Sequence, residues 1–173
     1  MRIVLGVTGS IAAYKACALV RLFVKAGHDV HVVMTAHAQE FVTPLTFQTL
    51  SRNKVETEMF APAQEWNPKH ISLATAADTV VVAPATANII AKMANGIADD
   101  VLSSLLLATK ARIFVAPAMN TGMWENPATQ RNIATLKAQG VRFVAPQTGE
   151  LACATTGPGR MAEVEDIFAA IAE

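Results

Sequence analysis

The sequence predicts a three-layer α/β/α fold of the Rossmann-like type, built on a parallel sheet of about six strands. Short apolar runs alternate with helical patterns along the chain, which is the order of βαβ units. Of the 173 residues, 52% are apolar but only 6% are aromatic. A core rich in alanine and valine is typical of a sheet that helices cover on both faces. The length suits one domain, so a single domain over residues 1–173 is expected.

The strands are predicted from runs that are β-branched and apolar on both faces, as in a buried parallel sheet. Four such runs are followed by a fifth near the C-terminus: Ile3–Val7, Val30–Met34, Val80–Ala83, Ile113–Ala116 and Val141–Ala145. A sixth segment, Val55–Phe60, is expected to be an edge strand.

Helices are predicted between these strands from the spacing of apolar residues and from the residues at their ends. In the first helix, the spaced apolar residues are followed by Gly27 as a stop. The helix over Ala98–Lys110 has two aspartates near its start, where the helix dipole favours negative charge. The helix over Asn126–Gln139 has a capping asparagine, a proline in its first turn and a glycine after its end. Right-handed βαβ connections should therefore link the strands.

The charge balance and the apolar runs exclude several classes of partner. The 14 Lys and Arg residues match 14 Asp and Glu residues, which gives no electrostatic basis for binding nucleic acid or an anionic membrane. No apolar run reaches the roughly 18 residues of a membrane helix, and Met1 leads into a run too short for a secretory signal. Cys17 and Cys153 lie far apart, so neither a disulfide framework nor a metal site is expected. The chain is expected to be cytoplasmic.

The turn after the first strand, Gly6–Ala13, has the composition of a phosphate site. Its small residues let the backbone approach a ligand, and the helix that follows favours a phosphate at its N-terminus. Ligands of open parallel sheets bind at this carboxyl edge. The spacing is not the GxGxxG of dinucleotide sites, which favours a mononucleotide phosphate. A simple tight turn capped by Ser10 explains the same residues.

Two further turns at the same edge carry polar side chains. Thr86 and Asn88 either cap the next helix or face a ligand. Asn120 stands between two methionines and precedes Trp124, a poor composition for a core or for a solvated turn. Its amide can donate to a carboxylate, while the methionines and the tryptophan can shield a flat apolar ligand. A purely structural loop is the alternative.

Two segments without periodicity, Ala61–Lys69 and Gly149–Met161, are expected to be irregular binding loops. His70 follows the first, and a histidine there is either a surface or capping residue or a catalytic base. Cys153 lies within the second near Arg160, where a thiol could donate a proton. A buried, inert cysteine is the simpler interpretation of the residues alone.

Taken together, these segments resemble the homo-oligomeric flavin-containing cysteine decarboxylases. The motifs that carry the resemblance occur in order along nearly the whole chain: GVTGSIAAYKA, HISLATAAD, VVVAPATANIIAKMANGIADD, APAMNTGMWENPATQRN and GELACATTGPGRMAE. The stretch Pro117–Trp124 fits the family's PxMNxxMW pattern in full, and that pattern is highly specific. One departure is the pair Thr75 and Ala76, where relatives often carry arginine and tryptophan, which changes the local packing.

The resemblance implies that FMN is the cofactor. Its phosphate would lie at the first turn, other residues would approach it from the end of the second strand, and the flavin would contact the turns of two more strands. In that order, the residues are Gly9, Ser10 and Ile11, then Thr35 and Phe41, then Thr86, Ala87, Asn88 and Ala118.

The resemblance also implies three catalytic residues. His70 would abstract a proton, Asn120 would bind the substrate carboxylate, and Cys153 would donate a proton in a reductive step. Arg160 and Lys92 are candidates for binding the substrate phosphate. The residues in contact with the small-molecule substrate would be Asn120, Met123, Ala152 and Met161.

The function that the resemblance implies is decarboxylation of phosphopantothenoylcysteine in coenzyme A biosynthesis, through thioaldehyde and enethiolate intermediates. An oxidative peptidyl-cysteine decarboxylase would stop at the enethiol and would not need Cys153. A flavin prenyltransferase shares the fold without the PxMNxxMW motif, and a non-catalytic FMN-binding partner protein explains neither His70 nor Cys153. The family further implies a homo-oligomer, a trimer or a dodecamer, with FMN near a subunit interface. It also implies a synthetase that is either fused to the chain or separate.

Overall fold

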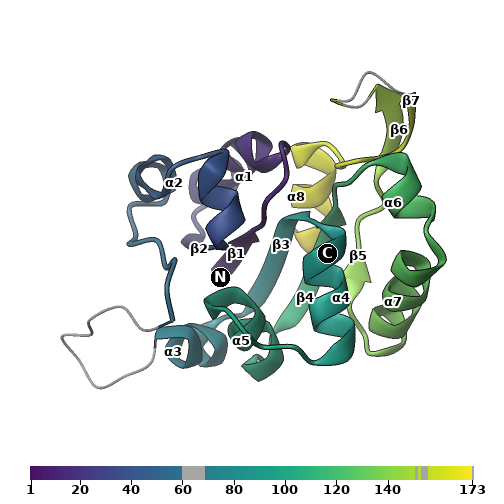
Figure 1. The fold of residues 1–173 in the computed structure, drawn as a ribbon. Coiled ribbons are helices and arrows are strands. Elements are labelled where there is room, and N and C mark those ends of the chain that lie inside the picture. The colour runs from purple at the N-terminus through teal and green to yellow at the C-terminus, as the bar shows by residue number, and fades with distance from the viewer. Residues whose placement is uncertain (60–68, 151, 153–155, 173) are drawn as a thin grey trace.

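The structure, a computed structural model, describes residues 1–59, 69–150, 152 and 156–172. Its centre is a five-stranded parallel sheet in the order β2-β1-β3-β4-β5 (Figure 1). The predicted α/β fold with a parallel sheet is confirmed, with five strands in place of about six. The strands are β1 (Arg2–Val7), β2 (Asp29–Met34), β3 (Thr79–Ala85), β4 (Arg112–Pro117) and β5 (Arg142–Phe143).

The expected edge strand Val55–Phe60 is reduced to a single bridge, which accounts for the difference in strand number. Glu56 pairs with β2 through two backbone hydrogen bonds, with Glu56 N donating to Val32 O at 3.0 Å and Met34 N donating to Glu56 O at 2.9 Å. Val55 and Glu56 are buried, but Glu56 is charged and the two residues after it are polar and not buried, so the segment has no continuous apolar face. Phe60 lies outside the described residues.

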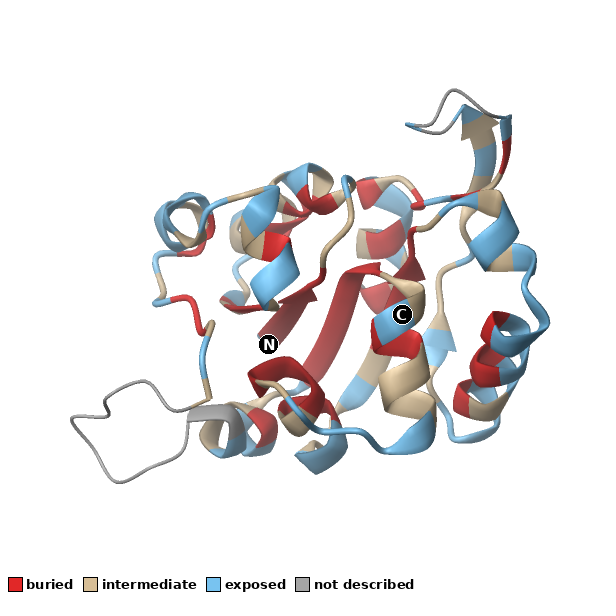
Figure 2. Cartoon of the chain, viewed as in Figure 1, coloured by how far each residue is buried: buried red, intermediate tan, exposed pale blue. Residues whose placement is uncertain are grey.

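Helices surround the sheet, and in chain order they are α1 (Ala13–Lys25), the 3₁₀ helix η1 (Ala36–Glu40), α2 (Pro44–Ser51), α3 (Lys69–Ala76), α4 (Ala87–Asn95), α5 (Val101–Ala108), α6 (Thr121–Glu125), α7 (Pro127–Ala138) and α8 (Val164–Ala172). Ile3 and Leu5 pack on one side against α1, α2 and α8, whereas Val4 packs on the other side against α3, α4, α5 and α7. Figure 2 shows the resulting buried sheet between two helical layers. No helix in the described part of the chain is long and apolar enough to cross a bilayer.

The observed helix ends follow the capping residues in the sequence. α1 stops before Gly27, which has a positive φ of 82°. α7 starts after Asn126, whose Oδ1 accepts from Ala128 N at 2.9 Å. α5 starts three residues later than the predicted Ala98, because Asp100 is its N-cap and Asp100 Oδ1 accepts from Ser103 N at 2.7 Å.

The segment Gly149–Met161, expected to be an irregular loop, instead contributes to an antiparallel hairpin. β6 (Gln147–Glu150) pairs with β7 (Thr156–Arg160), and the pair is separate from the main sheet. β7 is rich in glycine and contains a proline, so it has little strand propensity of its own. The expectation of an irregular loop was wrong for the residues in β6 and β7, because hydrogen bonds from Met119 and Thr121 hold β7 in place.

Candidate functional site

The carboxyl ends of β1 and β3 meet at the point where the strand order reverses. The chain passes from β1 to β2 on one side and then crosses to β3 on the other. In doubly wound sheets, a ligand binds in the crevice outside this switch point. The turn after β1 contains the predicted residues Gly9–Ile11, and the turn after β3 contains Thr86 and leads into α4, which begins with the predicted residues Ala87 and Asn88. The fold itself therefore places a ligand site beside them.

Thr8 joins these two turns. Its buried hydroxyl donates to Pro84 O at 2.7 Å and accepts from Thr86 N at 3.1 Å. Thr86 in turn caps α4, because its Oγ1 accepts from Ile89 N at 3.4 Å. The capping role that the sequence allowed for Thr86 is therefore present, and its neighbour Asn88 is exposed.

The 3₁₀ helix η1 follows β2 at the same edge of the sheet. Thr35 N donates to Val7 O at 3.1 Å, and Thr35 caps η1. A Cβ at Gly9 would lie 2.5 Å from the Cβ of His37, so the close approach of the first turn to η1 requires glycine. Phe41, which follows η1, is 48% exposed. Gly9 and Thr35 thus belong to one packed edge.

The N-terminus of α1 opens at this edge without a capping side chain. Its N-cap residue is Ala12, and no acidic residue lies in its first turn. Ser10 Oγ accepts from Ala12 N at 3.3 Å. Because the N–H groups and the dipole of a helix both favour an anion at this end, the start of α1 can bind a phosphate.

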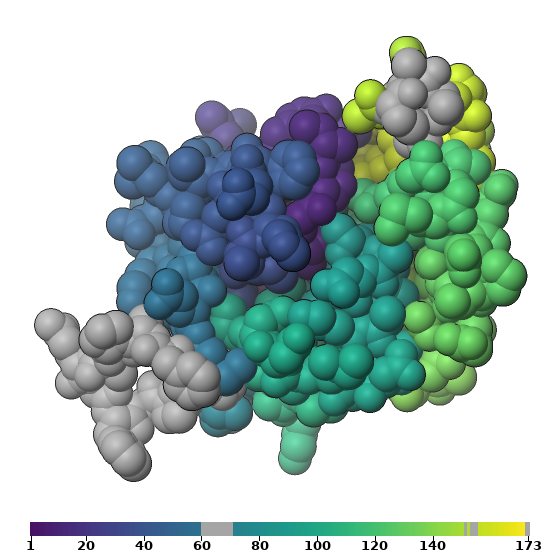
Figure 3. All heavy atoms as spheres, viewed as in Figure 1, coloured from purple at the N-terminus to yellow at the C-terminus, as the bar shows by residue number. Residues whose placement is uncertain are grey.

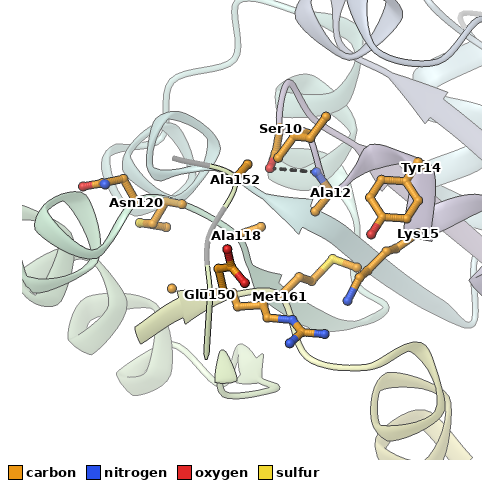
Figure 4. A pocket seen from close by; sticks show the side chains of 13 residues that line it. Ser10, Ala12, Tyr14, Lys15, Ala118, Asn120, Glu150, Ala152 and Met161 are labelled. Atoms are coloured by element: carbon orange, nitrogen blue, oxygen red, sulfur yellow. Dashed lines mark hydrogen bonds between the residues drawn. The ribbon is translucent and has the colours of Figure 1, made fainter. Parts of the chain in front are cut away.

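A cavity of about 600 Å³ lies at the start of α1, within the size range of small-molecule sites. Its walls come from α1, from the loop after β4 and from the β6–β7 hairpin (Figure 4). Figure 3 shows the purple start of the chain and the yellow-green hairpin on the same side of the molecule. The residues that line the cavity are Ser10, Ile11, Ala12, Tyr14, Lys15, Ala118, Met119, Asn120, Glu150, Ala152, Gly159, Arg160 and Met161.

The cavity brings together part of the predicted site. The predicted residues on its wall are Ser10, Ile11, Ala118, Asn120, Ala152 and Met161. Met123 is 49% exposed on α6 and does not line the cavity, whereas Met119 does. The predicted cofactor residues that do not line it lie at or near the ends of β1, β2 and β3, and they are Gly9, Thr35, Phe41, Thr86, Ala87 and Asn88.

The lining residues with polar or charged side chains that were not among the predicted site residues are Tyr14, Lys15 and Glu150. Tyr14 and Lys15 belong to the first turn of α1, directly after the predicted turn that contains Ser10 and Ile11. That position in the chain was the available signal. Glu150 belongs to β6, and its place depends on a hairpin that the sequence pattern did not reveal.

Asn120 combines a structural role with a place on the cavity wall. It is the N-cap of α6, where its Oδ1 accepts from Gly122 N at 2.8 Å. Its loop is held from two sides, because Ala118 N donates to Ala85 O at 2.9 Å and Met119 N donates to Gly159 O at 3.0 Å. The side-chain amide is therefore fixed relative to the cavity.

Two cations on the cavity wall share one carboxylate. Lys15 Nζ lies 3.2 Å from Glu163 Oε2, and Arg160 Nη2 lies 2.8 Å from Glu163 Oε1. Lys92 does not line the cavity and pairs instead with Asp100 at 2.9 Å. Desolvation opposes the charge of Lys92, but hydrogen bonds to two aspartates outweigh it and raise its pKa. Of the two candidates for a substrate phosphate, Arg160 is the one placed at the cavity.

The structure does not bring His70 to the cavity within one chain. His70 is the second residue of α3, and Figure 1 shows α3 at the opposite end of the molecule from the β6–β7 hairpin. The side chain of His70 and the whole of Cys153 lie outside the described residues. Among the residues that are described, no group of three or more His, Cys, Asp or Glu could hold a metal ion.

Comparison with curated proteins relates the chain to larger, bifunctional proteins of coenzyme A biosynthesis. The coenzyme A biosynthesis bifunctional protein CoaBC of Bacillus subtilis is 51% identical over 168 residues, which cover 95% of this chain and 41% of that protein. The corresponding protein of Haemophilus influenzae is 47% identical over 171 residues, or 99% of this chain and 43% of that protein. The chain thus spans about two fifths of the length of these relatives.

Comparison with solved structures shows the same fold along the whole chain. A PPC decarboxylase mutant complexed with pantothenoylaminoethenethiol has a TM-score of 0.87 at 31% identity, covering 99% of this chain and 96% of that one. The Flavoprotein family model matches residues 1–173. These matches confirm the resemblance inferred from the motifs, and the chain therefore belongs to the Flavoprotein family.

Proposed function

We propose that the chain catalyses the FMN-dependent decarboxylation of phosphopantothenoylcysteine to phosphopantetheine, a step of coenzyme A biosynthesis. The observation that carries this proposal is one cavity that joins the uncapped N-terminus of α1 to Asn120. A phosphate site and a carboxylate site then face the same space. The 51% identity to a CoaBC protein and the likeness to a PPC decarboxylase support the choice of substrate.

The residues around the cavity fit FMN. The turn of Gly9, Ser10 and Ile11 would hold its phosphate beside the N–H groups at the start of α1. The apolar wall at Ala118 would face the flavin. Further contacts would come from Thr35, Phe41 and Thr86–Asn88, which lie outside the cavity at or near the ends of β2 and β3. Apolar walls with a few polar groups are typical of cofactor sites. When bound, FMN supplies an acceptor for two electrons from the substrate and later a donor of the same electrons.

The chain's own residues would orient the substrate and move its protons. Loss of CO2 from an ordinary amino-acid carboxylate leaves an unstabilised carbanion, whereas loss from a thioaldehyde leaves an enethiolate that holds the electron pair on sulfur. Asn120 would bind the carboxylate through its amide, and His70 would abstract a proton from the substrate. Cys153 would donate a proton to the enethiolate in the reductive step. Ala152, Met123 and Met161 would contact the rest of the substrate.

A second copy of the chain would supply His70. This is supported by the distance between α3 and the hairpin within one chain (Figure 1). It is also supported by Ile11 and Tyr14, which line the cavity yet are 55% and 60% exposed. Exposed apolar side chains beside a ligand site form a surface that a neighbouring subunit can cover. A homo-oligomer, either a trimer or a dodecamer, would therefore complete the site.

The partner enzyme in this proposal is a synthetase that produces the cysteine-containing substrate. It would be fused to the decarboxylase domain of residues 1–173, as the name and length of the bifunctional relatives support, or separate from it. A phosphorylated substrate does not cross a bilayer unaided, so we place the reaction in the cytoplasm.

Mass spectrometry of the product tests the proposed function. The FMN-loaded protein is incubated with phosphopantothenoylcysteine, and the product should have lost CO2 alone. A product that has lost CO2 and two hydrogens would identify an oxidative decarboxylase and contradict the reductive step. An unchanged substrate, in a protein that retains flavin, would contradict decarboxylation altogether.

A further inference from the structure

The β6–β7 hairpin needs support from outside itself. It is a two-stranded sheet separate from the main one, and an isolated hairpin of two strands is marginally stable in water. β7 ends at Arg160, and Met161 follows, so this strand forms one wall of the cavity. The position of that wall relative to Asn120 therefore depends on what holds β7.

Two hydrogen bonds fasten β7 to the loop that contains Asn120. Met119 N donates to Gly159 O at 3.0 Å, on one side of Asn120 in the sequence. Thr121 Oγ1 donates to Pro158 O at 2.9 Å, on the other side. Consecutive residues of β7 are thus bonded to the two residues that flank Asn120.

The backbone of β7 lies directly against this loop. A Cβ at Gly159 would lie 2.3 Å from Met119 O, and Gly159 has a φ of +123° that disfavours any other residue. A Cβ at Gly157 would lie 2.3 Å from Thr121 Oγ1. Neither glycine has space for a side chain, because the backbone of β7 packs directly against Met119 and Thr121. The Thr121 hydroxyl therefore has no room to shift toward Gly157.

We propose that Thr121 is a positioning residue that fixes β7, and with it the hairpin, relative to Asn120. This inference rests on the proposed function. β6 and β7 are the strands that precede and follow Cys153 in the sequence. The hydrogen bond from Thr121 to Pro158 O therefore restrains β7 next to Asn120 and, with it, one end of the segment that contains the proposed proton donor. Small displacements of a reacting group can cost about a hundredfold in rate. Loss of the Thr121 bond should slow protonation more than it slows loss of CO2.

The consequence is a change of product. When protonation is slow, the enethiol leaves with two hydrogens fewer than phosphopantetheine. Its two electrons remain on FMN until dissolved dioxygen takes them, which gives one hydrogen peroxide for each enethiol. The ratio of enethiol to phosphopantetheine, and the peroxide formed per CO2, therefore report on Thr121. A residue that only stabilised the fold would lower both products together.

The test compares Thr121→Val with the wild-type enzyme loaded with FMN. Valine has the shape of threonine but cannot donate to Pro158 O, and its methyl group would lie too close to that oxygen. We expect the ratio of enethiol to phosphopantetheine to rise about tenfold or more, with matching peroxide. Thr121→Ser keeps the hydroxyl and should restore the wild-type ratio. Thr121→Ala serves as a second variant if the valine variant does not fold.

Two further variants, a matched control and a reference variant, are needed to interpret the result. Thr135→Val removes a similar hydroxyl, which donates to Arg131 O at 3.0 Å on α7, and should leave the ratio unchanged. Cys153→Ser should give the enethiol as its main product. An unchanged ratio in both Thr121→Val and Thr121→Ala would overturn the role of Thr121 alone. No release of CO2 by the wild-type enzyme would overturn the proposed function and this inference together.

Discussion

The side chain of Asn120 caps a helix, and the same residue lies on the wall of the cavity. Its Oδ1 caps α6 at Gly122 N, and the residue lines the cavity opposite the start of α1. Aspartate caps helices as well as asparagine does, so the two roles can be separated by a single substitution.

Asn120→Asp should keep the fold and the flavin but lose turnover. The new carboxylate retains the cap, whereas its charge repels the carboxylate of the substrate and should slow CO2 release about a hundredfold or more. Asn126→Asp is a matched control, because Asn126 caps α7 with Ala128 N at 2.9 Å and does not line the cavity. Wild-type rates in Asn120→Asp, measured with labelled carboxylate, would refute the assigned role.

The location of single residues on the cavity wall was predictable where they belong to a sequence motif. Ser10, Ile11 and Ala118 were expected at the site and line the cavity. Tyr14 and Lys15 were missed because they reach it only through the helical repeat of α1, which had been interpreted as a source of core residues. The helical spacing shows which face of α1 a residue occupies, but it does not show which part of that face lies near the β6–β7 hairpin.

Among the elements, β1 and β3 depend on Thr8 at their carboxyl ends. Its hydroxyl bonds to Pro84 O and to Thr86 N across two adjacent strands. Pro84 O belongs to β3, and Thr86 N belongs to the N-cap of α4, where three of the proposed flavin contacts begin. The relative position of the two cofactor turns therefore rests on one buried hydroxyl.

Thr8→Val should destabilise the protein and weaken FMN binding. The buried Pro84 O and the partly buried Thr86 N each lose a partner, which costs about 1–3 kcal/mol in the free energy of unfolding. Urea unfolding and FMN titration measure the two effects, and Thr8→Ser should approach wild-type values in both. If Thr8→Val unfolds at the wild-type urea concentration and binds FMN equally well, the hydroxyl does not hold these turns.

At the amino ends of the strands, Asp29 connects β2 to two other segments. Its carboxylate bonds to Arg2 Nε at 3.0 Å, to His31 Nε2 at 3.1 Å and to Asn53 Nδ2 at 2.9 Å. Partial burial opposes the charge, but hydrogen bonds from these three neighbours outweigh it and lower the pKa of Asp29 to about 2. The pKa of an unfolded aspartate is about 3.9.

This carboxylate should stabilise the fold above about pH 4 and lose that effect as the pH falls toward about 2. Because the side chain is 45% exposed, its contribution should stay below about 1 kcal/mol. Asp29→Asn should lower the free energy of unfolding at neutral pH by that amount, and the difference should shrink between pH 4 and 2. Urea unfolding at several pH values checks this. A difference that stays constant down to pH 2 would contradict it.

The elements of the main sheet were predictable, because β1, β3 and β4 are apolar on both faces and alternate with capped helices. The hairpin was not, because the residues of β7 are held by contacts with Met119 and Thr121 and not by strand propensity. The edge strand predicted over Val55–Phe60 was wrong for the opposite reason. Its apolar residues suggested a strand, but polar neighbours limit the pairing to Glu56.

At the scale of the whole molecule, α3 lies far from the cavity. In our proposal the complete site is therefore formed by residues of more than one chain. The β6–β7 hairpin and α3 lie at opposite ends of the chain's fold (Figure 1). The alternation of strands and helices predicted the layers. His70 lies in the helix that leads into the amino end of β3, whereas Asn120 follows the carboxyl end of the neighbouring strand β4, so the two residues lie at opposite edges of the sheet.

Mixing two inactive variants tests a shared site. His70→Asn and Asn120→Asp are each expected to be inactive, and chains mixed by unfolding and refolding together should regain activity. Random assembly would give about one site in four with both native residues, if those residues come from different copies. No recovery in mixed oligomers that contain both variants would show that each site uses residues of one chain.

The structure of the FMN-loaded protein at high resolution tests the central claim most directly, because it locates the cofactor relative to the cavity. The account predicts the phosphate within hydrogen-bond distance of the N–H groups at the start of α1, the flavin against Ala118, and His70 of a second chain beside it. FMN bound away from the cavity, or with its phosphate remote from α1, would contradict the account.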